Sequence, residues 1–404
     1  MDESGSPGRW SVVVVCAGTA VGLWRQGGRG ALDTVWAEDG QVFLSQAVLD
    51  PVGSLVTSYA GYYHVLPRLL AVTIAQLPAS WAAAALALSA ALITSVFAVA
   101  AFHLSAEYLP SPLGQLIISA PVAVLPLSRG DVLNSPANLH WTGLYLLFWL
   151  LLCRPASGPG KAFALLGIAL VAGSDILAGC YLPLAGSVLW LHRDRYALGK
   201  ALAFGTALAA QLAGLLSGAS RREGLQPDLL RPITGYLARV TPTALFGERW
   251  VGTEVNADGL MLAATAWLLV AAVLVVAWRR GSAPGWPIAA TAALHSVALY
   301  AAPVALSGVA TPRYAVAPAL LLLVSLVALL LPDRAPVLVL GALLLVSCLV
   351  NLRVDNPRGH GPAWSDELDH ARDTCATEGI VHVRIAPANP GWLASVSCDY
   401  LRRK

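Results

Sequence analysis

Long uninterrupted apolar runs constrain the fold of this chain more than any other feature. The runs 260–278 and 315–331 approach or reach the roughly 17–20 residues that span the hydrocarbon core of a bilayer. Only 12% of the 404 residues are charged, about half the share expected in a soluble protein. The runs do not alternate as the strands of a membrane β-barrel would. The sequence therefore predicts an all-α polytopic membrane protein.

The apolar pattern predicts about eleven transmembrane helices. Basic residues in short loops predict which side faces the cytoplasm, and four such loops lie at 153–161, 192–200, 278–286 and 332–336. All four fall inside if the N-terminus is cytoplasmic and the C-terminus extracytoplasmic. The first residues lack the basic region and cleavage site of a signal peptide, so we expect a retained first helix in a multi-pass protein of the cell membrane. The expected helices are 9–24, 80–103, 112–127, 140–153, 161–173, 177–192, 198–217, 260–278, 286–307, 314–331 and 335–351.

Two polar loops stand out on the expected outer side, at 25–79 and 219–259. The segment 64–77 within the first loop is apolar but short, and counting it as a span would place the basic loops outside. We therefore expect an interfacial helix there. The second loop carries five arginines, which long loops tolerate but which also suggest an anionic ligand. These arginines are Arg221, Arg222, Arg231, Arg239 and Arg249.

The chain divides into a membrane domain, 1–351, and a small α/β extracytoplasmic cap, 352–404. The segment 364–379 has helical spacing, with Ser365 as the candidate N-cap, and ends at Gly379. The alternating segment 380–385 then predicts a strand.

Cysteine positions support this division. Four cysteines lie in apolar runs, where cysteine behaves as a small hydrophobic residue: Cys16, Cys153, Cys180 and Cys348. Cys375 and Cys398 lie in the polar tail without the spacing of a zinc site. We expect a disulfide between them, which requires an oxidising compartment outside the cell membrane.

Adjacent carboxylates, Glu38 and Asp39, are the first candidates for chemistry. A carboxylate held in a desolvated cavity can act as a general base. The alternatives are a solvated loop, or an N-cap and first-turn charge for a helix over 41–49.

Basic residues near the expected outer surface offer a second kind of candidate. Arg313, followed by Tyr314, would bind a phosphate or anchor its helix at the interface. Arg68 lies four residues after His64, on one face of the interfacial helix. Its partner would be a lipid phosphate, a loop carboxylate or a headgroup.

The loop 128–141 carries residues suited to a sugar: Asp131, Asn134, Asn138, His140 and Trp141. Turn chemistry and an interfacial tryptophan explain the same composition. Asp175 is either a turn residue or part of the same cavity. The net charge of +3 and the lack of a dense basic cluster argue against a nucleic-acid partner.

Four motifs in order, WAEDGQVF, GYYHVLPRL, NSPANLHW and PRY, resemble the C-type superfamily of integral-membrane glycosyltransferases. The resemblance covers roughly 9–351 and implies a polyprenyl-phosphate-linked sugar as donor, used at the outer face. It maps the acidic catalytic residue to Asp39, with Glu38 second, and the donor-phosphate residue to Arg313. It also implies that Arg68 and His64 line the same cavity and that Asn138 and His140 contact the sugar or the acceptor. From the residues themselves, Tyr314, Tyr63 and Asp175 complete the expected binding positions.

The implied reaction is inverting transfer to a glycan, lipid or protein acceptor among membrane lipids. Part of the superfamily uses a divalent metal, and this sequence has no additional acidic cluster that demands one. The Ala-, Leu- and Arg-rich composition is typical of a high-GC bacterium, so we expect a cell-envelope enzyme. The alternatives are a lipid or sugar transporter or flippase, and a non-catalytic membrane assembly protein.

Overall fold

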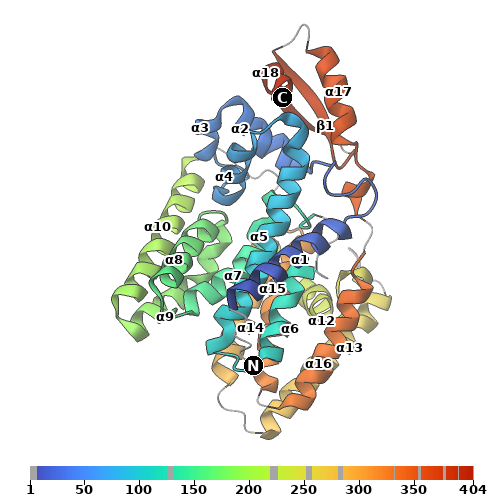
Figure 1. Cartoon of the computed structure of the whole chain (residues 1–404). Helices are drawn as coiled ribbons and strands as arrows, with labels where there is room; N and C mark the ends of the chain where they lie inside the picture. Colours follow the sequence, from blue (N-terminus) through green and yellow to red (C-terminus); the bar gives the residue numbers. More distant parts are fainter. Residues whose placement is uncertain are drawn as a thin grey trace, which may run out of the picture.

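The computed structural model describes residues 7–124, 127, 131–218, 226–251, 257–280, 285–331, 333–353, 356–375, 379–389 and 391–403. It is 77% helical and contains one small two-stranded sheet. The C-terminal cap lies at one end of a helical bundle (Figure 1).

Helices occupy all the places where the apolar runs predict them. Among the described residues, five segments are long and apolar enough to cross a membrane: Ala79–Glu107, Arg195–Ser217, Ala257–Arg280, Trp286–Ser307 and Pro312–Leu330. The other helices at predicted places are shorter or less apolar. The membrane character is therefore supported, and the count of about eleven spans stays a prediction. The helices are α1 (Pro7–Arg25), α5 (Ala82–Leu104), α6 (Pro112–Val124), α7 (Leu139–Leu152), α8 (Gly158–Ala172), α9 (Leu182–His192), α10 (Arg195–Ser217), α13 (Ala257–Arg280), α14 (Trp286–Ser307), α15 (Val316–Leu330) and α16 (Arg334–Val350).

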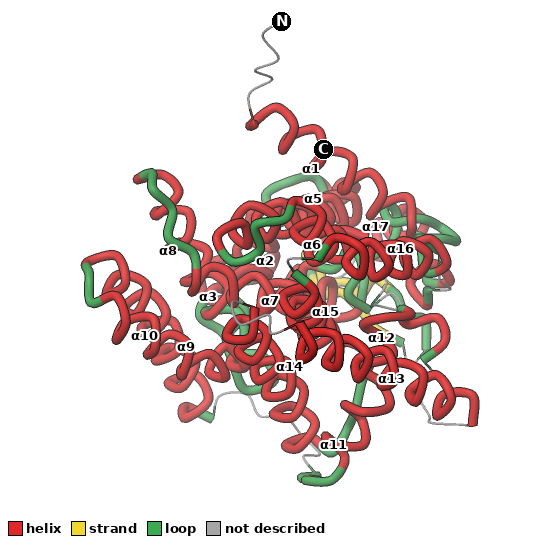
Figure 2. The backbone as a smooth tube through the Cα atoms, turned by 90° about the horizontal axis from the view of Figure 1, so that it is seen from below, coloured by secondary structure: helices red, strands yellow, loops and turns green. Residues whose placement is uncertain are grey.

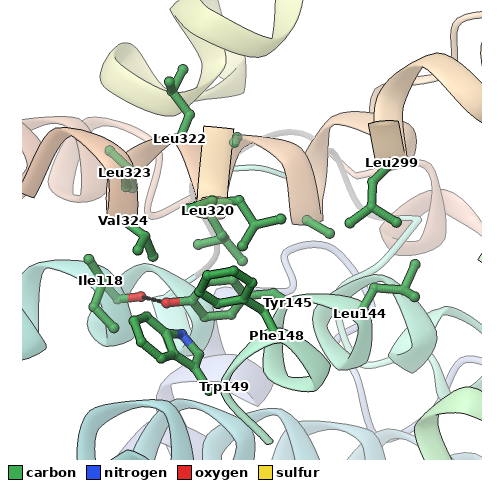
Figure 3. Close-up of a cluster of buried hydrophobic side chains, with 14 of the residues drawn as sticks. Ile118, Leu144, Tyr145, Phe148, Trp149, Leu299, Leu320, Leu322, Leu323 and Val324 are labelled. Atoms are coloured by element: carbon green, nitrogen blue, oxygen red, sulfur yellow. Dashed lines mark hydrogen bonds between the residues drawn. The ribbon is translucent and has the colours of Figure 1, made fainter. Parts of the chain in front are cut away.

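Two helices, α7 and α15, form the centre of the bundle (Figure 2). Every residue of α15 is buried, and so is every residue of α7 except its last. A helix that is apolar on all sides belongs in such a position. Figure 3 shows side chains of these two helices packed against each other, and the Tyr145 hydroxyl of α7 donates to the carbonyl of Ile118 in the neighbouring α6 at 2.8 Å. The backbone carbonyl thus satisfies a phenol deep in the apolar core.

The first polar loop folds into short helices. Asp39–Leu44 forms a π-helical turn (η1) that continues into α2 (Ser45–Leu49), and α3 (Pro51–Leu55) follows. The expected interfacial helix is α4 (Val65–Ile74), shorter than predicted at its C-terminal end. Its position relative to lipid stays a prediction.

The second polar segment, 219–259, is also folded rather than an open loop. Its described part contains α11 (Arg231–Gly235), the π-helical turn Tyr236–Val240, α12 (Thr241–Phe246) and the 3-10 turn Glu248–Trp250. Arg221 and Arg222 lie outside the described residues.

The cap contains α17 (Trp364–Thr374), β1 (Ile380–Ile385), β2 (Trp392–Ser397) and α18 (Cys398–Arg402). The strands pair antiparallel, with Ile380 opposite Ser397. The helix and first strand were expected, whereas β2 was not.

The predicted N-cap of the cap helix is wrong. Ala363 occupies that position, and Ser365 lies inside the first turn. Asp33 supplies the acceptor instead: its two carboxylate oxygens accept from the Ser365 backbone N–H at 2.8 Å and from its hydroxyl at 2.9 Å. A distant carboxylate therefore satisfies the free N–H group at this helix start, where negative charge is favourable.

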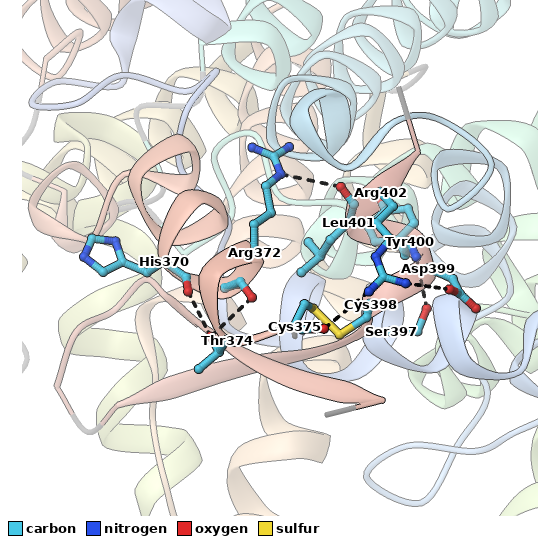
Figure 4. Close-up of a disulfide and its surroundings, with 11 residues drawn as sticks. His370, Arg372, Thr374, Cys375, Ser397, Cys398, Asp399, Tyr400, Leu401 and Arg402 are labelled. Carbon is cyan, nitrogen blue, oxygen red and sulfur yellow. Dashed lines mark hydrogen bonds and ion pairs between the residues drawn. A yellow bond between two sulfur atoms is a disulfide. The ribbon is translucent and has the colours of Figure 1, made fainter. Parts of the chain in front are cut away.

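Cys375 and Cys398 form the expected disulfide, with a Cα–Cα distance of 5.5 Å. It joins the end of α17 to the start of α18 (Figure 4). A unit with so small a core gains stability from such a covalent link.

Candidate functional site

A cavity of about 840 Å³ lies where several helices begin or end. Most of the predicted site residues line it, although they come from distant parts of the chain. Seven of the ten predicted residues do so: Glu38, His64, Asn138, His140, Asp175, Arg313 and Tyr314. The other three, Asp39, Tyr63 and Arg68, do not line it.

Glu38 and Arg313 meet across this cavity. The Nη1 atom of Arg313 lies 3.6 Å from Oε1 of Glu38, and their side chains are 26% and 16% exposed. The second carboxylate oxygen, Oε2 of Glu38, is buried and has no hydrogen-bond partner among the described residues. The cavity thus holds a carboxylate and a guanidinium within reach of one ligand.

Asp39, the first choice for the base, does not face the cavity. Its side chain is fully buried, and Oδ1 accepts from the backbone N–H of Ala137 at 2.7 Å. Burial raises the pKa of Asp39 to about 7, against the opposing effect of the Arg358 charge. Neighbouring residues in a helical turn point about 100° apart, so only Glu38 reaches the cavity. The structure therefore places Glu38, the second candidate, at the cavity and Asp39 outside it.

Arg358, in the 3-10 turn Pro357–His360, is a residue that sequence reasoning missed. It is fully buried and donates to the carbonyls of Leu133 at 3.0 Å and Asn134 at 2.7 Å. A longer bond of 3.3 Å reaches the carbonyl of Thr34. Arg358 therefore joins the cap to both loops that line the cavity. No local pattern distinguishes it from the other arginines of the tail.

The segment that carries Glu38 is bonded to the cap on its far side. The N–H of Ala386 donates to the carbonyl of Val35 at 2.9 Å, and the N–H of Ala37 donates to the carbonyl of Ala386 at 2.6 Å. This parallel bridge brackets Trp36, two residues before Glu38. The backbone leading into the carboxylate is therefore fixed by the cap.

Two side chains continue this contact along η1 and α2. Gln41 accepts from the N–H of Leu393 through Oε1 at 3.1 Å, and Ser45 accepts from the N–H of Ser395 through Oγ at 2.8 Å. Gly40 packs tightly against the same sheet, since an added Cβ would lie 2.6 Å from Cδ1 of Ile385. Two N–H groups of β2, those of Leu393 and Ser395, are thus satisfied by side chains of the first polar loop.

The cavity contains a second cluster of polar side chains, which belong to His64, His140 and Asp175. All three side chains are buried, and Nε2 of His140 lies 3.7 Å from Oδ2 of Asp175. The Oδ1 atom of Asp175 accepts from the N–H of Leu177 at 2.8 Å, which caps the following turn. Asp175 therefore caps a turn and also lines the cavity.

Two other predicted binding positions, Arg68 and Tyr63, lie outside the cavity and make contacts within the protein. Arg68 is buried and donates to Oε1 of Gln46 at 2.8 Å and to the carbonyl of Ser54 at 2.6 Å. It holds the first loop together rather than facing a ligand. Tyr63 packs against α10, because a Cβ added at Gly214 would lie 2.7 Å from its ring.

Asn138 lines the cavity, but its amide is used within its own loop. Its Nδ2 donates to the carbonyl of Asp131 at 2.8 Å and to Oγ of Ser135 at 3.0 Å. Its Oδ1 accepts from Nε1 of Trp141 at 3.3 Å. Both donors of the amide are therefore occupied, and Asn138 shapes the wall.

The cavity also has aromatic walls that sequence reasoning did not assign. Phe43, Tyr59 and Tyr62 line it beside His64. The signal was present in the segment YAGY, since a glycine between two aromatic residues is typical of a tight turn. No group of three His, Cys, Asp or Glu side chains among the described residues is placed to hold a metal ion.

Comparison with protein-family models, with curated proteins and with solved structures found no match to this chain. The resemblance to the C-type superfamily therefore stays a prediction from the four motifs. The chemistry of the cavity has to carry the functional interpretation.

Proposed function

We propose that this chain is an integral-membrane glycosyltransferase of a bacterial cell envelope. Its donor is a sugar linked to polyprenyl phosphate, and its acceptor is a glycan, lipid or protein with a free hydroxyl. One observation carries the proposal: a carboxylate and an arginine, Glu38 and Arg313, lie 3.6 Å apart in one cavity of about 840 Å³. Cavities that bind small ligands fall within this size range.

Glu38 has the role of general base. Its carboxylate accepts the proton of the acceptor hydroxyl as that oxygen attacks the anomeric carbon of the donor sugar. The bond from the anomeric carbon to the phosphate oxygen breaks on the opposite face, so the configuration inverts. The proton ends on Glu38 and the negative charge on the released polyprenyl phosphate.

Arg313 has the role of phosphate ligand. Its planar guanidinium presents several N–H donors to phosphate oxygens, and charge builds on these oxygens as the glycosidic bond breaks. A donor aimed at developing charge stabilises the transition state more than the substrate. In the structure the same guanidinium neutralises Glu38, and a bound phosphate would release the carboxylate to accept a proton.

The test uses the purified chain in proteoliposomes with polyprenyl-phosphate hexose and pentose donors labelled in the sugar, plus an envelope acceptor fraction. Glu38→Gln should lower transfer by about 10²–10⁴-fold, the usual contribution of a general base. Asp39→Asn is the matched control and should retain transfer, because Asp39 lies outside the cavity.

Two results would contradict the proposal. Equal rates of transfer by wild type and Glu38→Gln would show that Glu38 is not the general base. Movement of labelled lipid across the membrane without a covalent product would favour a flippase, the alternative that the apolar bundle also permits.

A further inference from the structure

A tight turn places two tyrosines side by side at the cavity wall. The N–H of Tyr59 donates to the carbonyl of Tyr62 at 2.9 Å, and the N–H of Tyr62 donates back to the carbonyl of Tyr59 at 3.2 Å. The two central residues, Ala60 and Gly61, have φ values of +51° and +94°. Such turns with two positive φ angles hold the flanking residues opposite each other. Both tyrosine side chains line the cavity.

His64 extends this aromatic wall into the cavity. Its ring stacks on Tyr62 with centroids 4.2 Å apart and an interplanar angle of 25°, and it lies 5.3 Å from the ring of Phe43. On the other side the ring of His140 lies 6.0 Å from His64, nearly at a right angle. A continuous aromatic surface therefore leads from the Tyr59 turn to the start of α7.

Several polar atoms along this surface are buried without a hydrogen bond among the described residues. They belong to two imidazoles and a carboxyl group: Nδ1 of His64, both ring nitrogens of His140, and Oδ2 of Asp175. A buried polar atom costs free energy when it lacks a partner. Two of them, Nε2 of His140 and Oδ2 of Asp175, face each other at 3.7 Å, beyond hydrogen-bond distance. Together with Nδ1 of His64 and Nδ1 of His140 they indicate a ligand that supplies hydrogen bonds to this wall.

The charge state of this wall restricts the ligand further. Burial, together with the nearby His140 and Arg68, holds the pKa of His64 well below its usual range, so the imidazole is neutral. Burial also raises the pKa of Asp175 to about 7. The fixed charges lining the cavity are Glu38 and Arg313, which neutralise each other.

We propose that Tyr59, Tyr62, His64, His140 and Asp175 form a subsite for an uncharged sugar ring. The C–H groups of a sugar face carry partial positive charge and pack on the negative faces of aromatic rings. Its hydroxyl groups both donate and accept, and therefore suit neutral imidazole nitrogens. Among the described residues that line the cavity, the cation is Arg313, which already faces Glu38. An acidic sugar would therefore bring a carboxylate without a partner of its own to a buried wall, at a high desolvation cost.

This inference rests on the proposed function, and it narrows the substrate class to neutral hexoses and pentoses. The ring could belong to the donor or to a glycan acceptor. Both share the same chemistry, and separate kinetic measurements distinguish them.

The binding test uses the full-length chain in lipid nanodiscs with methyl glycosides of neutral hexoses and pentoses, and a methyl glucuronide as the acidic probe, followed by saturation-transfer NMR. Wild type should bind a neutral glycoside at least about tenfold more tightly than the glucuronide. His64→Phe keeps the ring and removes the nitrogens, and Tyr62→Leu removes the ring. Each should weaken neutral binding by about tenfold, the size of one lost contact.

Tyr63→Leu is the matched control, because this neighbouring tyrosine lies outside the cavity, and binding should be unchanged. Equal binding of the glucuronide, or full binding by both His64→Phe and Tyr62→Leu, would overturn the subsite.

The transfer assay separates the two possible sources of the ring and the two proposals. A raised KM for the donor in Tyr62→Leu assigns the ring to the donor, and a raised KM for the acceptor assigns it to the acceptor. Transfer with both KM values unchanged would refute the subsite and leave the glycosyltransferase intact. Neutral-sugar binding without any transfer would refute the enzyme and leave the subsite intact.

Discussion

Asp39 offers a sharp test of the distinction between a buried structural carboxyl and a catalytic one. Asp39→Asn keeps an acceptor for the N–H of Ala137, which lies 2.7 Å from Oδ1. It removes only the capacity to ionise. Wild type and Asp39→Asn should therefore have the same fold and differ in the pH dependence of their free energy of unfolding.

The size of the effect follows from the pKa shift. The pKa of Asp39 is raised from 3.8 to about 7, chiefly by burial, so the folded protein favours the protonated carboxyl. The resulting stability is fully present below pH 4 and is lost as the pH rises through 7. At 1.36 kcal/mol per pKa unit, integration from pH 5 to pH 8 gives a loss of about 2–3 kcal/mol for wild type. Asp39→Asn should lack this loss.

The assay is chemical unfolding of both proteins in the same detergent at pH 5 and pH 8. The informative quantity is the change with pH in the difference between their free energies of unfolding, because other titrating groups cancel. An unchanged difference would refute the reasoning. A reversed sign would show that attraction to Arg358 outweighs burial, so that the folded protein holds Asp39 ionised.

Further predictions concern the bonds between the cap and the first loop. Gln41→Ala removes the acceptor for the N–H of Leu393 and should lower kcat by about fivefold, the worth of one hydrogen bond, with KM unchanged. Gln41→Glu keeps an acceptor and should restore kcat. Arg384→Ala, at an exposed position of the cap, should leave kcat unchanged. An equal loss of kcat in Gln41→Ala and Arg384→Ala would instead indicate a general effect on the stability of the cap. Replacing Cys375 and Cys398 by alanine opens a loop with a sequence separation of 23 and should destabilise the cap by about 3 kcal/mol in chain-entropy terms, measured as faster proteolysis of the cap. Unchanged proteolysis would mean that packing alone holds the cap.

The helices of the bundle could be predicted because their signal is local. An apolar run of sufficient length is enough to predict a helix at that place. The helix α15 is apolar on all sides because every side of it is buried. The disulfide was predictable for a similar reason, since Cys375 and Cys398 are the cysteines outside apolar runs. The strand β2, in contrast, buries Ala394 and Val396 at alternate positions, but its sequence WLASVS does not alternate between apolar and polar residues. The N–H groups of Leu393 and Ser395 are satisfied by side chains of the first loop.

The site was predictable as a set but not in its orientation. Seven of the ten residues chosen from motifs line one cavity, because polar residues at the ends of neighbouring apolar helices meet at one face. Whether Glu38 or Asp39 points into the cavity depends on the phase of a single helical turn, and both residues fit the motif equally well. Arg358 and Asp33 act through contacts with residues more than 200 positions away, and no local pattern encodes such pairs.

These long-range contacts give the cap a role that its small size does not suggest. The backbone before Glu38 is bonded to Ala386, and Gln41 after it accepts from the N–H of Leu393 in β2. Between them, Gly40 lies so close to the sheet that an added Cβ would be 2.6 Å from Cδ1 of Ile385. A carboxylate on a free loop would sample many positions, whereas this one is fixed at both ends. Since misplacement of a catalytic group by about 1 Å can cost about 100-fold in rate, the cap contributes to the proposed chemistry by positioning Glu38, without contributing a residue to the cavity.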